Sequence, residues 1–485
     1  MKTENLTHTW NVAAVRVAVL LSVLLLSFAA KADFTKGKFV YRFLEKGDEV
    51  EVCGWTSKYD YITIPEKVTY GTKTYTVTRI AENAFMDAGV WGADIPNTVT
   101  EIGAYAFSGC KMNYVTIPPS VKVIGEYAFE EMNNHYPHDG RYVKVQISDL
   151  TAWCDIDFAN EYANPLSTGY EYFGQMGDYG ELYLNGERIL DLVIPDGVTT
   201  IKQYAFCIHF RSVTLPPSVK EIGRGALFRH DSIRKDIEAL YLSDIAAWCK
   251  VTGDIPRVKN HYLNGELLTD LVIPEGVTSI SPYIFWLSES ITSVTIPNTV
   301  TEIGESAFYA CKNLNNVLIP NSVTEIKEKA FANCSTLETV TIGNSLKTLG
   351  KNAFGDCESL KDFFICNPVP PTADHDAFGY FTFNNSPTLH VPRNSIPDYR
   401  MSSVWSQFPL IVDDASGIED VTSEEEIGFT VSGGVLTVTG VEGCMIEIYD
   451  MSGRRVYEGV SPVVSGLPRG IYLLKAGNRT AKICI

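Results

Sequence analysis

The sequence predicts a repeat solenoid of short β-strands and single helical turns, followed by a small β-sandwich. A unit with fixed proline and phenylalanine positions recurs through most of the chain, and a segment of alternating apolar and polar residues follows it. At 485 residues the chain is also longer than one ordinary hydrophobic core can fill, which favours several domains or a repeat array.

The N-terminus has the pattern of a targeting segment. Lys2 and Arg16 precede an apolar run over residues 17–30, and this run is short for a membrane-spanning helix. The small residues of a cleavage site follow in Ala30-Lys31-Ala32. We therefore expect residues 1–32 to be the signal peptide of an exported protein, with a membrane anchor as the alternative interpretation of the same run.

The repeat unit is clearest from Val294 to Phe308, and it recurs over residues 317–331 and 115–129. Its anchor residues in this region are 23 positions apart, at Pro297, Pro320 and Gly343. Leucine takes the position eleven residues after Pro216, at Leu227. At the other anchors a phenyl ring occupies this position: Phe107, Phe129, Phe206, Phe285, Phe308, Phe331 and Phe354. We expect a solenoid with a period of about 23 residues over residues 33–412, including its N- and C-terminal caps.

Each part of the unit has a physical interpretation. Val294 and Ile296 flank a polar residue before Pro297, as in a short strand with one buried side. Proline then ends the strand because it has no N–H group to donate. We expect Ala307 and Phe308 to lie on a single helical turn, with the phenyl ring inside the coil. One unit cannot bury its own apolar side, so the units must stack into a continuous core.

The cysteines fit the same repeat. The chain has eleven, and four of them follow the repeated phenylalanine at a constant offset: Cys110, Cys311, Cys334 and Cys357. Small thiol groups at this offset favour a buried ladder of free cysteines. A disulfide between neighbours such as Cys311 and Cys334 is the alternative, although parallel side chains would strain the bridge.

A longer unit that ends in Ala-Trp-Cys occurs at residues 145–154 and again at 240–249. Its Ser-Asp pair predicts a helix N-cap followed by one or two helical turns. A Tyr-Leu-Asn-Gly-Glu segment follows each copy, and its Asn-Gly pair predicts a two-residue hairpin turn. The first copy also carries an insertion with Tyr162, Tyr170 and Tyr172, which is either a contact surface or a simple loop.

The chain changes character near residue 412. Aromatic residues such as Phe378, Tyr399 and Trp405 predict a terminal cap over the open apolar end of the solenoid. Residues 413–427 are rich in Asp and Glu and predict an acidic linker. Residues 428–485 alternate apolar and polar residues between turn signals, which predicts a β-sandwich of six or seven strands.

The repeat Val-Thr-Ile-Pro-x-Ser-Val-x-x-Ile-Gly-x-x-Ala-Phe-x-x-Cys closely resembles the BspA-type leucine-rich repeat of bacterial surface proteins. The resemblance covers roughly residues 60–412. It implies a curved solenoid that adheres to host matrix proteins or to other cells, and it implies no catalytic residues.

The tail of the chain has a second resemblance. The segment from Ile446 to Tyr457 and the segment from Gly466 to Lys475 are similar to the C-terminal sorting domain of type IX secretion. In that system the domain carries cargo across the outer membrane and is commonly removed. The resemblance therefore implies a protein that is secreted or associated with the outer membrane at the cell surface, with the secretion machinery as a partner of residues 428–485.

Charge and motifs exclude several functions. The formal net charge is −18, which would repel nucleic acid, so we expect no nucleic-acid partner. The sequence contains no G-x-S-x-G, Walker-type, H-E-x-x-H or C-x-x-C motif. His135, His138 and residues 374–376 include ligand-type side chains, but both sets lie in predicted loops. We expect a protein that is not an enzyme and has no cofactor or metal site.

We expect adhesion or protein–protein interaction through the outward side of the stacked strands, with an extracellular or host-surface protein as the partner. The candidate contact residues are those that point outward in the predicted strands: Tyr114, Thr116, Thr214, Ser293, Thr295, Asn316, Leu318, Thr339 and Thr341. Intrinsic β propensity also explains threonine at these positions. The alternative function is that of a glycan-binding surface protein that uses the tyrosine-rich insertion around residues 160–180.

Overall fold

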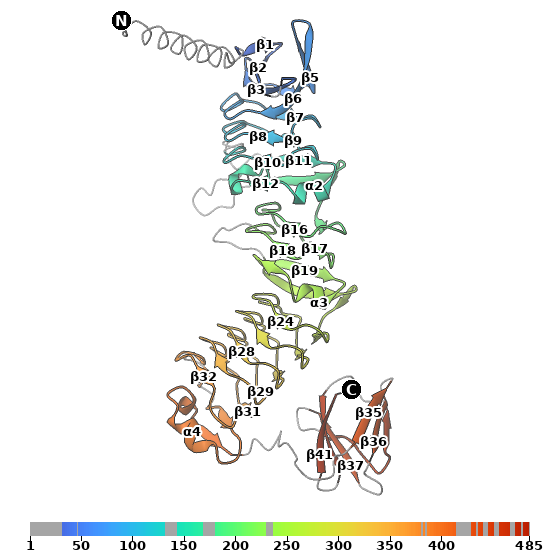
Figure 1. Ribbon diagram of the computed structural model, residues 1–485, viewed down its shortest axis with the longest axis vertical. Coiled ribbons are helices and arrows are strands. Elements are labelled where there is room, and N and C mark those ends of the chain that lie inside the picture. Colours follow the sequence, from blue (N-terminus) through green and yellow to red (C-terminus); the bar gives the residue numbers. More distant parts are fainter. Residues whose placement is uncertain are drawn as a thin grey trace, which may run out of the picture. The chain divides into compact units, whose positions relative to one another are not determined.

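The computed structural model describes most of the chain between Ala32 and Cys484 (Figure 1). The described residues are 32–45, 47–130, 143–167, 180–228, 236–379, 382–383, 386–413, 428–432, 435–439, 445–450, 455–465, 471–476 and 479–484. The chain divides into two compact units, residues 1–267 and 268–485. Apart from Ala32 and Asp413, the predicted signal peptide and acidic linker lie outside the described residues, so both stay predictions.

The first unit begins with antiparallel strands that lead into a parallel stack. β1 pairs with β2 and β2 pairs with β3 in antiparallel orientation, whereas β3 and β6 are parallel. The sheet has the order β1-β2-β3-β6-β8-β10-β12, with β5 paired to β6. Its strands are β1 (Phe34–Lys36), β2 (Phe39–Phe43), β3 (Glu49–Trp55), β5 (Lys67–Tyr70), β6 (Lys73–Ile80), β8 (Glu101–Ile102), β10 (Val123–Ile124) and β12 (Asp157–Phe158).

Three more sheets complete the coils of the first unit, and most of their strand pairs are parallel. The six-stranded sheet has the order β14-β13-β11-β9-β7-β4, and the later coils form the sheets β15-β17-β19-β21-β22 and β16-β18-β20. The strands are β4 (Tyr61–Thr63), β7 (Gly92–Asp94), β9 (Tyr114–Thr116), β11 (Lys144–Ile147), β13 (Glu181–Leu184), β14 (Glu187–Arg188), β15 (Asp191–Val193), β16 (Thr200–Ile201), β17 (Ser212–Leu215), β18 (Glu221–Ile222), β19 (Ile237–Leu242), β20 (Thr252–Gly253), β21 (Val258–Leu263) and β22 (Glu266–Leu267).

The second unit contains a seven-stranded sheet, β23-β25-β27-β29-β31-β33-β34, and a five-stranded sheet, β24-β26-β28-β30-β32. Each pair from β23/β24 to β31/β32 contributes one strand to each sheet, whereas β33 and β34 extend the seven-stranded sheet alone, and neighbouring strands are parallel. The strands are β23 (Asp270–Val272), β24 (Ser279–Ile280), β25 (Ser293–Thr295), β26 (Glu302–Ile303), β27 (Asn316–Ile319), β28 (Glu325–Ile326), β29 (Thr339–Ile342), β30 (Thr348–Leu349), β31 (Asp362–Ile365), β32 (Thr372–Ala373), β33 (Thr388–His390) and β34 (Leu410–Val412). The predicted solenoid of short strands is confirmed.

Turns that carry the repeated phenylalanine close each coil. The Phe308 ring is fully buried and stacks between Phe285 and Phe331, with centroid distances of 5.4 and 5.1 Å. The single helical turn expected here does not form, because Ser306 has a φ of 51° and its N–H group donates to the carbonyl of Glu328 in the next coil. Hydrogen bonds to the next coil therefore alternate with local ones, such as that from the N–H group of Ala307 to the carbonyl of Gly304, in place of the continuous series of a helix.

Single helical turns occur instead in the two longer units, as predicted. α2 (Leu150–Cys154) follows Asp149, whose Oδ1 accepts a hydrogen bond from the N–H group of Ala152 at 3.0 Å. α3 (Ile245–Trp248) has the same N-cap geometry at Asp244. Among the described residues, no helix has the length and apolarity needed to cross a bilayer.

The two Asn-Gly pairs form the predicted hairpin turns. Asn185 and Gly186 connect β13 to β14 with φ values of 52° and 86°. Asn264 and Gly265 connect β21 to β22 with nearly the same values, 53° and 87°. Positive φ at both central residues is the requirement of this turn type, and Asn-Gly meets it at low cost.

Aromatic side chains pack against the last coils of the solenoid. α4 (Ile396–Met401) and the 3-10 helix η3 (Trp405–Gln407) carry the buried side chains of Tyr399 and Trp405. The Trp405 Nε1 group donates to the carbonyl of Pro371 at 3.0 Å, and its ring lies 6.0 Å from that of Phe363. The apolar end of the stack is thereby kept from water.

The repeated cysteines form a ladder of free thiols, as predicted. The Sγ atom of Cys311 donates to the carbonyl of Phe285 at 3.2 Å, and that of Cys334 donates to Phe308 at 3.2 Å. Desolvation raises the pKa of the Cys311 thiol to about 12. All nine cysteines whose side chains are described are unbridged.

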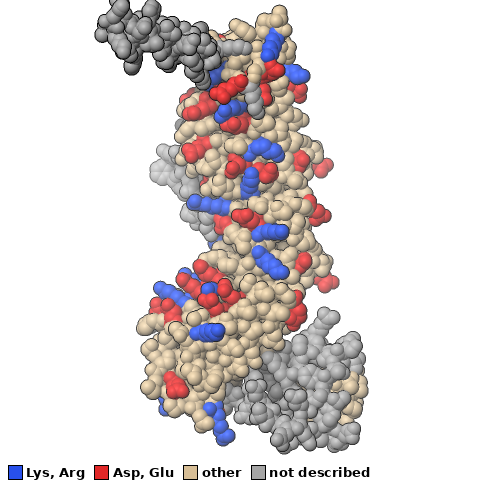
Figure 2. Space-filling view, in the orientation of Figure 1, with Lys and Arg blue, Asp and Glu red and all other residues tan. Residues whose placement is uncertain are grey.

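Charged side chains are mixed by sign on the face shown in Figure 2. Several ion pairs connect side chains of neighbouring coils: Arg79 lies 2.5 Å from Glu101, and Lys361 lies 2.8 Å from Glu338. Exposed pairs of this kind contribute little stability in water.

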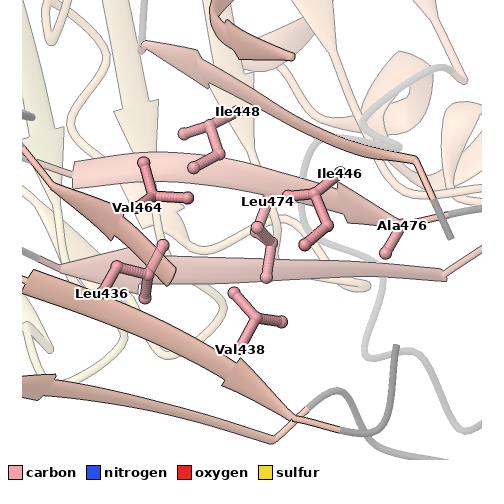
Figure 3. Packing of buried hydrophobic residues seen from close by; sticks show 7 residues of the cluster. All are labelled: Leu436, Val438, Ile446, Ile448, Val464, Leu474 and Ala476. Atoms are coloured by element: carbon pink, nitrogen blue, oxygen red, sulfur yellow. The ribbon is translucent and has the colours of Figure 1, made fainter. Parts of the chain in front are cut away.

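The C-terminal residues form a β-sandwich with its own core (Figure 3). One sheet has the order β35-β36-β39 and the other the order β38-β37-β40-β41. Leu436, Ile448 and Leu474 lie in the core between the sheets and are fully buried. The strands are β35 (Gly428–Ser432), β36 (Val435–Thr439), β37 (Ile446–Asp450), β38 (Arg455–Gly459), β39 (Val463–Ser465), β40 (Ile471–Ala476) and β41 (Arg479–Cys484).

Candidate functional site

The structure places six of the nine predicted contact residues in two rows on the seven-stranded sheet. The first row consists of the register partners Ser293, Asn316 and Thr339. The second row consists of Thr295, Leu318 and Thr341. All six are exposed or half-buried, whereas Val294 and Val317 between the rows are buried. We call these six residues the second-unit strand surface.

This surface continues onto neighbouring strands with apolar and aromatic groups. Val272 begins the second row and is 55% exposed. At the other end, Phe364 is the register partner of Thr341, and its ring stacks on the His390 imidazole with centroids 4.0 Å apart. The His390 Nε2 atom lies 3.0 Å from Oδ1 of Asp362. The sheet thus presents apolar, aromatic and polar groups side by side.

Tyr114 and Thr116 lie together on a different sheet, the six-stranded one of the first unit. The Tyr114 hydroxyl donates to Oδ1 of Asp94 at 2.9 Å, and the Thr116 hydroxyl donates to the same oxygen at 2.8 Å. Desolvation raises the pKa of Tyr114, so its hydroxyl stays protonated and remains a donor. These hydrogen bonds hold both side chains on the outer side of the sheet.

Thr214 lies on a third sheet, between Val193 and Tyr241 in the strand register. The rings of Tyr241 and Tyr262 stack with centroids 4.7 Å apart. The nine predicted residues are therefore distributed over three sheets, two in the first unit and one in the second.

The sequence interpretation missed an aromatic cluster beside Tyr114. Tyr59, Tyr61 and Trp91 are all exposed, and Trp91 lies 6.3 Å from Tyr59 and 6.1 Å from Tyr61 between ring centroids. The available signal was the strand position of Tyr61, which precedes Ile62-Thr-Ile-Pro65 as Tyr114 precedes Val115-Thr-Ile-Pro118.

Residues 374–376, which the sequence offered as possible metal ligands, form a turn. The Asp374 Oδ1 atom accepts the N–H group of Asp376 at 3.0 Å, and the His375 ring is exposed beside Asp376. Within the described residues, no group of three or more His, Cys, Asp or Glu side chains could hold a metal ion. The candidates from His135 to Asp139, and residues 168–179 of the tyrosine-rich insertion, lie outside the described residues.

The chain is similar to known repeat proteins. The sequence profile of the BspA type leucine rich repeat region matches six copies, over residues 78–136, 181–243 and 257–389. A leucine rich cell surface protein from Faecalibacterium prausnitzii A2-165 is 22% identical, with 77% of this chain and 98% of that protein covered and a TM-score of 0.43. A leucine-rich repeat protein from Bacteroides ovatus ATCC 8483 is also 22% identical, with coverage of 79% and 99% and a TM-score of 0.45. The pneumococcal vaccine antigen PcpA is 16% identical, with coverage of 79% and 98% and a TM-score of 0.41. A comparison with curated proteins gave no match.

Proposed function

The chain belongs to the BspA-type leucine-rich repeat family, and from this premise we propose that it is an exported, non-enzymatic surface protein that binds another protein through its outward strand surface. Proteins of this family are typically secreted or located at the cell surface. The family itself suggests protein–protein interaction or adhesion. The partner that we propose is an extracellular or host-surface protein.

The observation that carries this proposal is the register of the second-unit strand surface. Parallel hydrogen bonding holds neighbouring strands about 4.8 Å apart, so the backbone positions from which the side chains of each row project are set before any partner arrives. A preorganised backbone loses less conformational entropy on binding than a flexible one. Leu318 places an apolar side chain beside the polar side chains of Thr341 and Asn316, and non-obligate interfaces also combine apolar and polar groups.

We extend the proposal to the C-terminal sandwich, which would act as the sorting domain for secretion. The similarity of the segments around Ile446 and Lys475 to type IX sorting domains supports this assignment, as does a hydrophobic core that belongs to the sandwich alone. If residues 413–485 are removed, cell fractionation should find the solenoid retained in the periplasm, on the inner side of the outer membrane. Unchanged surface exposure of the shortened protein would contradict this assignment.

Binding to a panel of immobilised extracellular matrix proteins tests the main proposal by surface plasmon resonance. Leu318→Lys places a charge in the centre of the second-unit strand surface and should lower the affinity by about tenfold or more. Thr348→Lys is the matched control, because Thr348 is exposed on the five-stranded sheet beside Glu325. Equal affinities of the two variants, or no matrix binding by the unmodified protein, would refute the proposal.

A further inference from the structure

Tyr59, Tyr61 and Trp91 form an exposed aromatic corner at the β4 edge of the six-stranded sheet. Their exposed fractions are 57%, 56% and 41%. Single apolar residues are common on protein surfaces, but three adjacent large rings leave a contiguous apolar patch in water. Such a patch, rimmed by polar groups, is typical of a binding site.

The Tyr61 ring is held flat across the neighbouring strand by two features. A Cβ atom on Gly92 would lie 2.7 Å from Cδ1 of Tyr61, so the ring occupies the space that a side chain would fill there. The Tyr61 hydroxyl hydrogen bonds to the Asn113 side chain, in the second coil beyond Tyr61, at 3.0 and 3.2 Å. One side of the ring therefore lies on the backbone of Gly92, and the other side faces solvent.

The Trp91 ring stands beside the open side of the Tyr61 ring. The plane of the Trp91 ring makes an angle of 71° with that of the Tyr61 ring, so the two rings are nearly perpendicular and do not stack. The Tyr59 ring also lies close to Trp91, with centroids 6.3 Å apart, and it rests against Gly89, where a Cβ atom would be 3.0 Å from Cδ1 of Tyr59. The corner is thus built by two tyrosines, each lying over a glycine, and a tryptophan that is close to both.

Hydrogen-bond acceptors and hydroxyl groups line the adjacent strands. Asp94 is exposed and accepts hydrogen bonds from the hydroxyls of Tyr114 and Thr116. Asn113 adds an amide beside the Tyr61 hydroxyl. A ligand with an apolar face and hydroxyl groups at its edge matches both parts of this surface.

From this geometry we propose that the aromatic corner binds a neutral glycan. The C–H face of a sugar ring stacks on the open side of Tyr61, its edge contacts Trp91, and its hydroxyl groups hydrogen bond to Asp94 and Asn113. The net charge of −18 disfavours a polyanionic glycan. A proline-rich peptide fits less well, because proline has no N–H group to donate to the Asp94 carboxylate, whereas a sugar hydroxyl can donate to it. This site adds a second ligand class and does not depend on the protein partner proposed above.

Affinity electrophoresis of the full-length mature protein in native gels tests this proposal. The probes are starch, mannan, xylan, galactan and a mixed-linkage β-glucan, with heparin and poly-L-proline as comparisons. Trp91→Ala removes the indole ring, whereas Gly92→Ala adds a methyl group that displaces the Tyr61 ring without removing any aromatic side chain. Val193→Ala is the matched control, since Val193 is 58% exposed on another sheet of the same unit.

We expect at least one neutral polysaccharide to retard the unmodified protein and the Val193 variant equally. Both corner variants should lose the retardation, with an increase in dissociation constant of about tenfold or more, while their thermal unfolding midpoints show that they fold. No retardation by any neutral polysaccharide overturns the proposal, as does retardation that survives both corner variants. Loss of heparin or poly-L-proline binding in these variants, without neutral glycan binding, would assign the corner to another ligand. Matrix-protein binding is measured separately, so failure of one proposal leaves the other standing.

Discussion

The phenyl rings of Phe308 and Phe331 lie one repeat apart, with their centroids separated by 5.1 Å and their planes 6° from parallel. This separation is close to the distance of about 4.8 Å between neighbouring strands of a sheet. Both rings are fully buried. The column of rings and the ladder of strands therefore share one spacing, and each helps to hold the other in register.

Replacing Phe308 by alanine should lower the free energy of unfolding by about 3–5 kcal/mol, because the lost ring leaves a cavity between two neighbouring rings. Urea denaturation followed by circular dichroism measures this loss. Val272→Ala in the same unit is the control, since Val272 is 55% exposed and should change stability by at most about 0.5 kcal/mol. Equal effects of the two substitutions would place the Phe308 ring outside the core.

The buried thiols should make the protein less stable in alkali. In the folded state the pKa of Cys311 is raised from 9.0 to about 12 by desolvation. Below pH 9.0 the thiol is protonated in both states, and above it the unfolded state loses the proton first. The free energy of unfolding should therefore fall as the pH rises from 9.0 towards 12, by up to roughly 1.4 kcal/mol per pH unit for this group.

The check on this pH dependence is the Cys311→Ala variant. Its stability should fall less steeply than that of the unmodified protein over the same pH range, although the variant is less stable at neutral pH. Chemical denaturation at a series of pH values gives both slopes. Parallel profiles would show that this thiol is not shielded from water.

At the Asn-Gly hairpins, the effect of backbone strain can be measured without a steric clash between side chains. Gly186 has a φ of 86°, and a Cβ atom built on it would meet no other atom within 4 Å. Gly186→Ala should therefore destabilise the protein by about 1–2 kcal/mol through backbone conformation alone. Gly186→Asn should cost less, because asparagine tolerates this region better. An increase in the thermal midpoint of the alanine variant would contradict the assigned turn.

Local chemistry made much of the fold predictable. The period of the proline anchors places Val294 opposite Val317, which is the observed register. Asp149 at the N-cap and Asn185-Gly186 at the hairpin act within a few residues of sequence, so their roles could be recognised without the structure. The outward direction of the nine candidate contact residues followed from the two-residue period of a strand.

Features that depend on a neighbouring coil could not be predicted in the same way. The turn at Ser306 has a positive φ without glycine, and its geometry is supported by a hydrogen bond to Glu328 of the next coil. The aromatic corner likewise depends on Gly92, which is close to Tyr61 in space but belongs to the next coil. Residue patterns within one repeat do not contain these relationships.

The most direct test of the single-register stack is a double-mutant cycle between Phe308 and Phe331, measured by urea denaturation. Rings in direct contact should give a coupling energy of about 0.5–1.5 kcal/mol when both are replaced by alanine. The pair Phe308 and Phe354, separated by the ring of Phe331, should be close to additive. Additivity of Phe308 and Phe331 themselves would contradict the stacked coils on which the proposed strand surface depends.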